Sequence, residues 1–253
     1  MAELREEQRG RARWLTIDRP AQRNALTFGL LGDLRASLAR ADADAAVRAI
    51  ALTAEGEKAF CAGADLSGGS IAGQDAPRAY AALLVDLSKL GKPVVAVVNG
   101  SVLGGGMGLL AACDLAIAAQ DARFGTPEVD LGLFPYMALA PLTRLIGRRA
   151  ALDLMFTARK IDAAEARSIG LVNRVVPRAE LAAQADALLE TLAAKSPTAL
   201  RLGRRAFYAT QDLPYEQQLE ALCAQLSLNA RTEDAAEGVA AFLEKRKPDF
   251  KGR

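Results

Sequence analysis

The chain has 253 residues, of which 51% are hydrophobic and 25% charged, a composition typical of one compact globular domain. This hydrophobic content excludes a mainly disordered chain, and a net charge of +2 provides no basic surplus for binding nucleic acid. The chain contains no histidine, which excludes a His-based catalytic triad, a His metal site and a His general base. Acid–base chemistry must therefore use Glu, Asp, Lys, Tyr or Cys.

The three cysteines, Cys61, Cys113 and Cys223, lie far apart and form no CxxC pair. This spacing indicates neither a disulfide framework nor a zinc site, so we expect no bound metal. The first residues are charged and lack an apolar signal segment. The longest apolar stretch begins at Val102 and is interrupted by Asp114. We therefore expect a cytoplasmic protein without a membrane span.

The first part of the chain alternates predicted strands with predicted helices. Leu31, Leu34 and Leu38 follow the spacing of an amphipathic helix, and Thr27 is suited to cap it. The uninterrupted apolar run at 94–98 predicts a strand buried on both faces, as in a sheet covered by helices. The other elements expected here are strands at 14–17 and 49–53, a mobile Gly- and Ser-rich loop at 66–77, and a helix at 77–90.

Helix signals become frequent in the second half of the chain. Asp162 followed by Glu165 predicts a helix start, and Gly170 predicts a helix end. Ser196-Pro197 predicts the start of a further helix. The other elements expected here are a helix at 109–113 and strands at 115–118 and 171–176.

The fold class is therefore α/β, with a core at 1–195 and a C-terminal helical region at 196–253. Leu219, Leu222 and Leu226 form an apolar stripe in this helical region. We expect the stripe to serve oligomerisation; the alternative is that these helices fold back onto their own subunit.

Four segments carry residues suited to binding or catalysis. The small residues of Phe60–Leu66 let a ligand approach the backbone, although alone they are better explained by a tight turn. Gly104–Gly106 opens a helix, where unpaired N–H groups favour a phosphate or a developing oxyanion; close packing and a dinucleotide loop are the alternatives. Glu128 stands among apolar residues, so it is either a proton-transfer group with a raised pKa or a solvated loop glutamate. The charged run at 244–247 is either a solvated face or a contact for an anionic ligand.

Taken together, these segments resemble the crotonase superfamily, the enoyl-CoA hydratase/isomerase family, over nearly the whole chain. Seven motifs stand in the family's order. They are Arg19-Pro20 with Asn24-Ala25-Leu26, FCAGADL at 60–66, KPVVAVVNGSVLGGG at 92–106, CDLAIA at 113–118, FGTPE at 124–128, IDAAEARSIGLVNRVVP at 161–177 and AFLEKRKPDF at 241–250.

The resemblance implies a spiral of ββα units whose C-terminal helical region builds trimers, often paired into hexamers. It implies an acyl-CoA thioester as ligand, and no cofactor beyond the CoA that is part of the substrate. By analogy, the thioester oxygen lies between the backbone N–H groups of Ala64 and Gly105, which stabilise an enolate, and Glu128 transfers the proton. The residues expected along the CoA and acyl path are Arg23, Ala25, Ala62, Ala64, Asp65, Leu66, Gly108, Tyr136, Leu226 and Lys245, the last reaching CoA phosphate from a neighbouring subunit.

One position departs from the family pattern. Many hydratases of the family hold the attacking water between two glutamates, and the first of these corresponds to Gly108, which has no side chain. A single carboxylate at Glu128 suffices to move a double bond, so hydration and Δ3,Δ2-enoyl-CoA isomerisation both stay open. Hydration would need Tyr136, Asp130 or backbone groups to hold the water, and Asp130 would share a face with Glu128 if that segment is extended. Tyr136 and Met137 are expected to shape the acyl pocket.

Two other classes of protein are alternatives. A non-catalytic acyl-CoA-binding homologue would keep Ala64, Gly105 and Lys245 but would not need Glu128. A nucleotide-binding oxidoreductase would need an acidic residue about twenty positions after the glycines, close to where Glu128 stands, but it has no role for FCAGADL.

Overall fold

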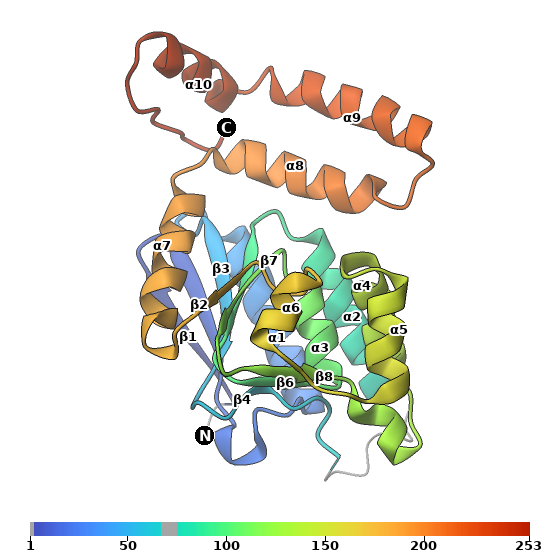
Figure 1. Cartoon of the computed structure of the whole chain (residues 1–253). Coiled ribbons are helices and arrows are strands. Elements are labelled where there is room, and N and C mark those ends of the chain that lie inside the picture. Colours follow the sequence, from blue (N-terminus) through green and yellow to red (C-terminus); the bar gives the residue numbers. More distant parts are fainter. Residues whose placement is uncertain (1–2, 67–74) are drawn as a thin grey trace.

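The computed structural model describes residues 3–66 and 75–253 and contains two sheets surrounded by helices (Figure 1). The larger sheet has six strands in the order β1-β2-β3-β5-β7-β10, with β1 antiparallel to β2 and the other pairs parallel. Its strands are β1 (Leu4–Arg9), β2 (Ala12–Ile17), β3 (Ala49–Ala54), β5 (Val94–Val98), β7 (Leu115–Ala119) and β10 (Arg174–Val176).

The smaller sheet lies across one end of the larger one and has the order β4-β6-β8-β9. Its strands are β4 (Ala59–Cys61), β6 (Ser101–Leu103), β8 (Arg123–Gly125) and β9 (Ile161–Asp162). Because β4, β6 and β8 are parallel, the ends of β4 and β6 deliver their following residues to one edge of this sheet. The two glycine-containing segments of the sequence therefore meet there.

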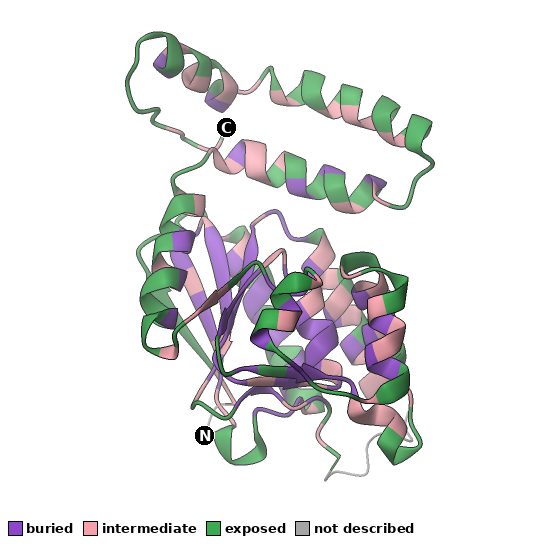
Figure 2. Ribbon diagram, in the orientation of Figure 1, coloured by how far each residue is buried: buried purple, intermediate pink, exposed green. Residues whose placement is uncertain are grey.

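Helices cover both faces of the larger sheet, as the apolar run at 94–98 predicts. Val94, Ala96 and Val98 pack into the main core, whereas Val95 and Val97 face a second core on the other side of the sheet. Helix α7 covers the second face, and α1, α2 and α3 lie against the first (Figures 1 and 2). These helices are α1 (Phe28–Ala43), α2 (Asp75–Lys89), α3 (Gly105–Ala111) and α7 (Leu181–Ala193).

Capping residues set several helix starts. The side chains of Thr27, Asp162 and Ser196 accept hydrogen bonds from the N–H groups at the starts of α1, α6 and α8, as predicted. Gly170 has φ +82°, which suits the predicted helix end. The remaining helices are α4 (Tyr136–Leu145), α5 (Arg148–Thr157), α6 (Ala163–Ser168), α8 (Pro197–Thr210), α9 (Tyr215–Asn229) and α10 (Glu233–Leu243), with short 3-10 turns at Pro20–Gln22, Pro127–Leu131 and Arg178–Glu180.

Some predicted boundaries are wrong. The third helix begins at Gly105 rather than at residue 109: the glycine run opens the helix, as expected, and itself forms the first turn. The last strand is shorter than predicted and begins at Arg174, since residues 171–173 follow the turn at Gly170. Most of the loop predicted at 66–77 lies outside the described residues, and α2 already begins at Asp75.

Helices α8, α9 and α10 form a separate tier (Figure 1). Arg204 of α8 fastens this tier to the body: its guanidinium lies 2.8 Å from the Asp114 carboxylate and donates to the carbonyl of Leu87 at 2.6 Å. Helix α9 buries none of its residues, so it does not fold back into the core of its own subunit. Among the described residues, no helix is long and apolar enough to cross a membrane; the cytoplasmic location stays a prediction.

Candidate active site

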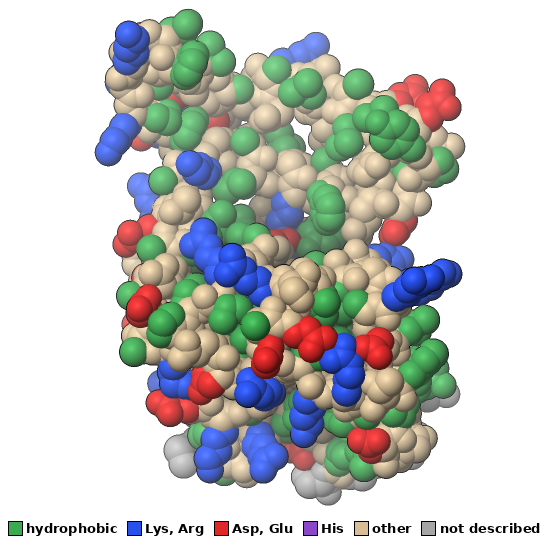
Figure 3. Space-filling view, viewed as in Figure 1, with side chains coloured by type: hydrophobic (Ala, Val, Ile, Leu, Met, Phe, Trp, Pro, Cys, Tyr) green, Lys and Arg blue, Asp and Glu red, His purple; other side chains and the backbone are tan. Residues whose placement is uncertain are grey.

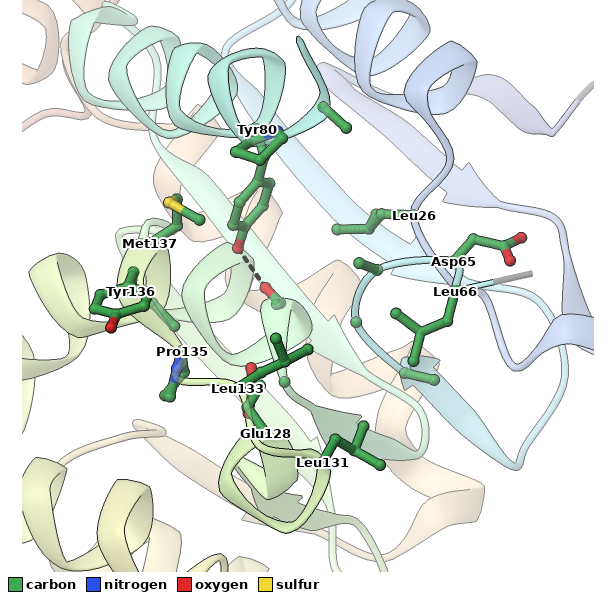
Figure 4. A pocket seen from close by; sticks show the side chains of 18 of the residues that line it. Leu26, Asp65, Leu66, Tyr80, Glu128, Leu131, Leu133, Pro135, Tyr136 and Met137 are labelled. Atoms are coloured by element: carbon green, nitrogen blue, oxygen red, sulfur yellow. Dashed lines mark hydrogen bonds between the residues drawn. The ribbon is translucent and has the colours of Figure 1, made fainter. Parts of the chain in front are cut away.

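A pocket of about 1060 Å³ opens where the smaller sheet meets α1, α2, α3 and α4. The segments that follow β4 and β6 form one wall, and the 3-10 turn at Pro127–Leu131 with the start of α4 forms the opposite wall (Figure 4). Its lining is largely apolar. It includes Leu26, Phe28, Leu31, Leu66, Leu131, Leu133, Phe134, Pro135, Met137 and Ala138.

Two backbone N–H groups lie beside each other in this pocket, those of Ala64 and Gly105. A Cβ built on Gly63 would lie 3.1 Å from the nitrogen of Gly105, and one built on Gly105 would lie 3.7 Å from the nitrogen of Ala64. Gly63 has φ +95°, a conformation that a side chain would strain, so glycine permits this close approach. Within the described chain neither N–H donates to a protein acceptor, because Gly105 starts a helix and Ala64 follows a strand.

The Glu128 carboxylate lies beside Gly104, the residue that precedes Gly105. A Cβ on Gly104 would lie 3.1 Å from Glu128 Oε1, so the absence of a side chain at Gly104 gives the carboxylate its place. Burial raises the pKa of Glu128 above its ordinary value. Its Oε2 is buried and accepts no hydrogen bond from the described residues. A half-buried carboxylate with one unpartnered oxygen is suited to taking and returning a proton.

Gly108 lies inside α3 and is buried. It faces Tyr80 of α2 and Ala138 of α4: a Cβ at this position would lie 2.5 Å from the Tyr80 hydroxyl and 3.1 Å from the Ala138 Cα. No space is therefore available for a side chain at residue 108. Tyr80 itself lines the pocket and donates a hydrogen bond to the carbonyl of Gly105 (Figure 4).

The two residues expected to hold water beside Glu128 are placed differently. Residues 127–131 form a 3-10 turn rather than an extended segment, so Asp130 does not share a face with Glu128. Asp130 is exposed and is absent from the pocket lining. Tyr136 lines the pocket with Met137 but is 69% exposed, and its ring lies 5.3 Å from that of Phe134. These positions put Tyr136 at the pocket's outer part.

The other expected ligand contacts fall into two groups. Ala62, Asp65 and Leu66 line the pocket. Asp65 also pairs with Arg19, at 2.9 Å between Oδ2 and Nη2.

The second group lies outside the pocket. Ala62 N donates to the carbonyl of Arg23 at 3.1 Å, which places the exposed Arg23 and the buried Ala25 beside the pocket without lining it. Leu226 on α9 and Lys245 after α10 belong to the upper tier, and one chain alone does not bring them to the pocket.

Sequence reasoning missed Tyr80. The signal was present, because Tyr80, Leu83 and Leu87 repeat at the spacing of one helix face and all three are buried. A tyrosine on the buried face of a helix carries a hydroxyl that needs a hydrogen-bond partner, so this pattern makes Tyr80 a candidate site residue.

The sequence pattern of the enoyl-CoA hydratase/isomerase family matches residues 9–253. The chain is 37% identical to a short-chain-enoyl-CoA hydratase of Clostridium acetobutylicum, over 98% of this chain and 97% of the relative. It is 36% identical to the 2,3-dehydroadipyl-CoA hydratase of Escherichia coli over the full length of both.

Solved structures show the same fold. The crystal structure of an enoyl-CoA hydratase from Bacillus anthracis superposes with a TM-score of 0.94, covers 100% of both chains and shares 34% identity. An enoyl-CoA hydratase from Mycobacterium smegmatis gives a TM-score of 0.95 at 33% identity and covers 99% of both chains.

Proposed function

The chain is an enzyme of the enoyl-CoA hydratase/isomerase family, and we propose that it adds water to the C2=C3 double bond of a 2-enoyl-CoA thioester. One observation carries the proposal: the unpartnered N–H groups of Ala64 and Gly105 and the unpartnered Oε2 of Glu128 converge in one largely apolar pocket. The names of the two relatives, both hydratases, favour water addition.

The two N–H groups form an oxyanion hole in this proposal. Water addition at C3 moves the π electrons of the double bond onto the thioester oxygen, and two fixed donors stabilise that charge. Removing one such donor typically costs about 2.7–4 kcal/mol of transition-state stabilisation. The donors need no reorganisation during the reaction, because Ala64 and Gly105 are held by backbone packing around Gly63.

Glu128 is the acid and the base. Its carboxylate removes a proton from the water as the oxygen bonds to C3, and the same proton then returns to C2 of the enolate. The products are a C3 hydroxyl and a C2 hydrogen, so one water molecule is consumed. The raised pKa suits both steps, since the carboxylate is a stronger base and its acid form is available nearer neutral pH.

The acyl group is proposed to be uncharged. The side chains around the pocket are mainly Leu, Phe, Pro and Met, and its described lining contains no lysine or arginine. A terminal carboxylate on the acyl chain would find no cation there and would lie near Glu128 and Asp65. A dicarboxylic acyl group, which needs a cation for its second carboxylate, therefore does not suit this pocket.

The active form is proposed to be a trimer or hexamer that needs no cofactor apart from the CoA of the substrate. Apolar side chains on α9 and α10 support assembly, and Figure 3 shows hydrophobic side chains gathered on the surface of this upper tier. The exposed fractions are 69% at Leu226 and 82% at Phe242. Arg23 and Ala25 are proposed to contact CoA at the pocket entrance. Leu226 and Lys245 are proposed to contact CoA across an interface between subunits.

The second candidate is Δ3,Δ2-isomerisation, favoured by the single carboxylate and the glycine at position 108. A direct assay separates the candidates: crotonyl-CoA and a matched 3-enoyl-CoA are supplied in turn, and products are identified by mass and proton NMR. We expect 3-hydroxyacyl-CoA from crotonyl-CoA. Exclusive conversion of the 3-enoyl thioester would favour isomerisation, and binding without turnover of either would favour the non-catalytic alternative.

A further inference from the structure

Tyr80 is a buried phenol inside the candidate active site. Only 8% of the residue is exposed, and its side chain belongs to the main core. Its hydroxyl donates to the carbonyl of Gly105, the residue whose N–H lies beside that of Ala64. Burial raises the pKa of Tyr80 well above its ordinary value, so the phenol is neutral at physiological pH and keeps its proton.

The hydroxyl occupies the place where a side chain at residue 108 would begin. A Cβ on Gly108 would lie 2.5 Å from Tyr80 Oη, far inside contact distance. The Tyr80 hydroxyl can occupy this place because residue 108 is a glycine. The polar group found there therefore comes from α2 and not from α3. The Tyr80 proton is donated to Gly105 and the backbone N–H of Leu109 donates to Oη, which leaves one lone pair of Oη for a further hydrogen bond.

Glu128 lies beside Gly104, the residue before helix α3 begins. Its Oε1 lies 3.1 Å from the Cβ position of Gly104, and its Oε2 has no partner among the described residues. Tyr80 and Glu128 both line the pocket, and Figure 4 shows both side chains directed into it. In addition to burial, the charge of Glu128 contributes to raising the pKa of Tyr80, so the two groups are near enough to interact.

We propose that Tyr80 Oη and the Glu128 carboxylate together hold the reacting water, which donates one hydrogen bond to each of them. This inference rests on the proposed hydration function. As the water oxygen bonds to C3, its proton passes to Glu128 and the π electron pair moves to the thioester oxygen. The proton then returns from Glu128 to C2. Tyr80 neither gains nor loses a proton, so it is a positioning residue that fixes the water's direction of attack.

The test separates water positioning from proton transfer. Tyr80→Phe removes only the hydroxyl, and hydration of crotonyl-CoA is compared with exchange of the C2 protons of butyryl-CoA in D₂O, followed by proton NMR. Exchange uses Glu128 and the oxyanion hole but no attacking water. We expect the kcat for hydration to fall at least 10-fold, with KM and the exchange rate within 2-fold of wild type. Tyr215→Phe, at an exposed tyrosine of α9, is the matched control and should change neither rate.

Each outcome decides the proposal. Hydration by Tyr80→Phe within 2-fold of wild type overturns it, and so does an equal loss of hydration and exchange, which indicates a structural role for the bond to Gly105. A wild type that exchanges C2 protons but hydrates no 2-enoyl-CoA overturns the hydration function itself. If Tyr80→Phe folds poorly, a crystal structure of the wild-type enzyme decides instead. It should show a water molecule about 2.8 Å from both Tyr80 Oη and a Glu128 carboxylate oxygen, and an ordered pocket with no water in this place overturns the proposal.

Discussion

The Tyr80 hydroxyl and Gly108 fill one place in the pocket from two different helices, since a Cβ on Gly108 would lie 2.5 Å from Tyr80 Oη. This contact changes the explanation for the glycine at position 108. Considered by sequence alone, Gly108 is a missing carboxylate that a substitution could restore. In the structure it is the space that a tyrosine from α2 requires.

Gly108→Ala is expected to destabilise the protein. The added methyl group would meet Tyr80 Oη at 2.5 Å and the Ala138 Cα at 3.1 Å, and such overpacking typically costs about 1–3 kcal/mol. Urea unfolding measures the change. Gly32→Ala is the control, because nothing lies within 4 Å of a Cβ at that position of α1. Equal stability of Gly108→Ala and wild type would contradict the contact.

Gly108→Glu is expected to gain hydration activity only when Tyr80 is shortened as well. A glutamate at position 108 has no room beside the phenol, so the single variant should lose stability without gaining rate. The pair Tyr80→Ala/Gly108→Glu should hydrate crotonyl-CoA faster than Tyr80→Ala alone. The kcat of the three variants, measured with circular dichroism as a check of folding, tests this dependence; a well-folded Gly108→Glu that outperforms wild type would refute it.

Glu128→Gln is expected to lower kcat at least ~100-fold with little change in the Kd for a CoA ligand. Glutamine keeps the size of the side chain but cannot exchange a proton, and general acid–base catalysis is typically worth 10²–10⁴-fold. Steady-state kinetics and titration calorimetry measure the two quantities. Near-normal turnover of the variant would mean that another group moves the proton.

The free energy of unfolding should depend on pH in a way that Glu128 explains. Its pKa in the folded chain lies above the ordinary value of 4.5, so between these two values the folded chain holds the proton more tightly than the unfolded chain. Burial of the charge therefore costs stability at neutral pH and costs nothing below pH 4.5. Thermal unfolding should show Glu128→Gln more stable than wild type at pH 7, with the difference vanishing as the pH falls toward 4. A difference that grows on acidification has the wrong sign for this explanation.

A crystal structure with a bound acyl-CoA should place the thioester oxygen about 2.7–3.1 Å from the nitrogens of Ala64 and Gly105. The two nitrogens already lie side by side without protein acceptors, so little backbone movement is expected. An ordered thioester with its oxygen elsewhere would remove the oxyanion hole from the proposal.

Light scattering is expected to give three or six times the chain mass of 26.7 kDa at micromolar concentration. The exposed apolar side chains of α9 and α10 need a partner, because α9 buries none of its residues within one chain. Leu219→Glu should weaken the assembly, whereas Glu220→Gln on the next residue should not. A wild type that stays monomeric would contradict the assembly and the proposed contact between Lys245 and CoA.

Much of the scaffold could be predicted from the amino-acid sequence. Val94–Val98 is apolar at every position because both of its faces are buried, and the predicted caps at Thr27, Asp162 and Ser196 all form. These features depend on local spacing and backbone chemistry, which are legible along the chain. The order of the seven motifs also indicated the family, since each motif is local and their succession needs no coordinates.

Which groups share the pocket could not be predicted in this way, because it depends on how distant segments pack together. Tyr80 and Gly108 are 28 positions apart, and their contact depends on how α2 packs against α3. Asp130 stands two residues from Glu128, yet the 3-10 turn directs it outward, whereas an extended segment would have put both on one face. The physical reason is that helix orientation and the space left for each side chain depend on packing between elements. The local sequence pattern of one segment does not contain this information.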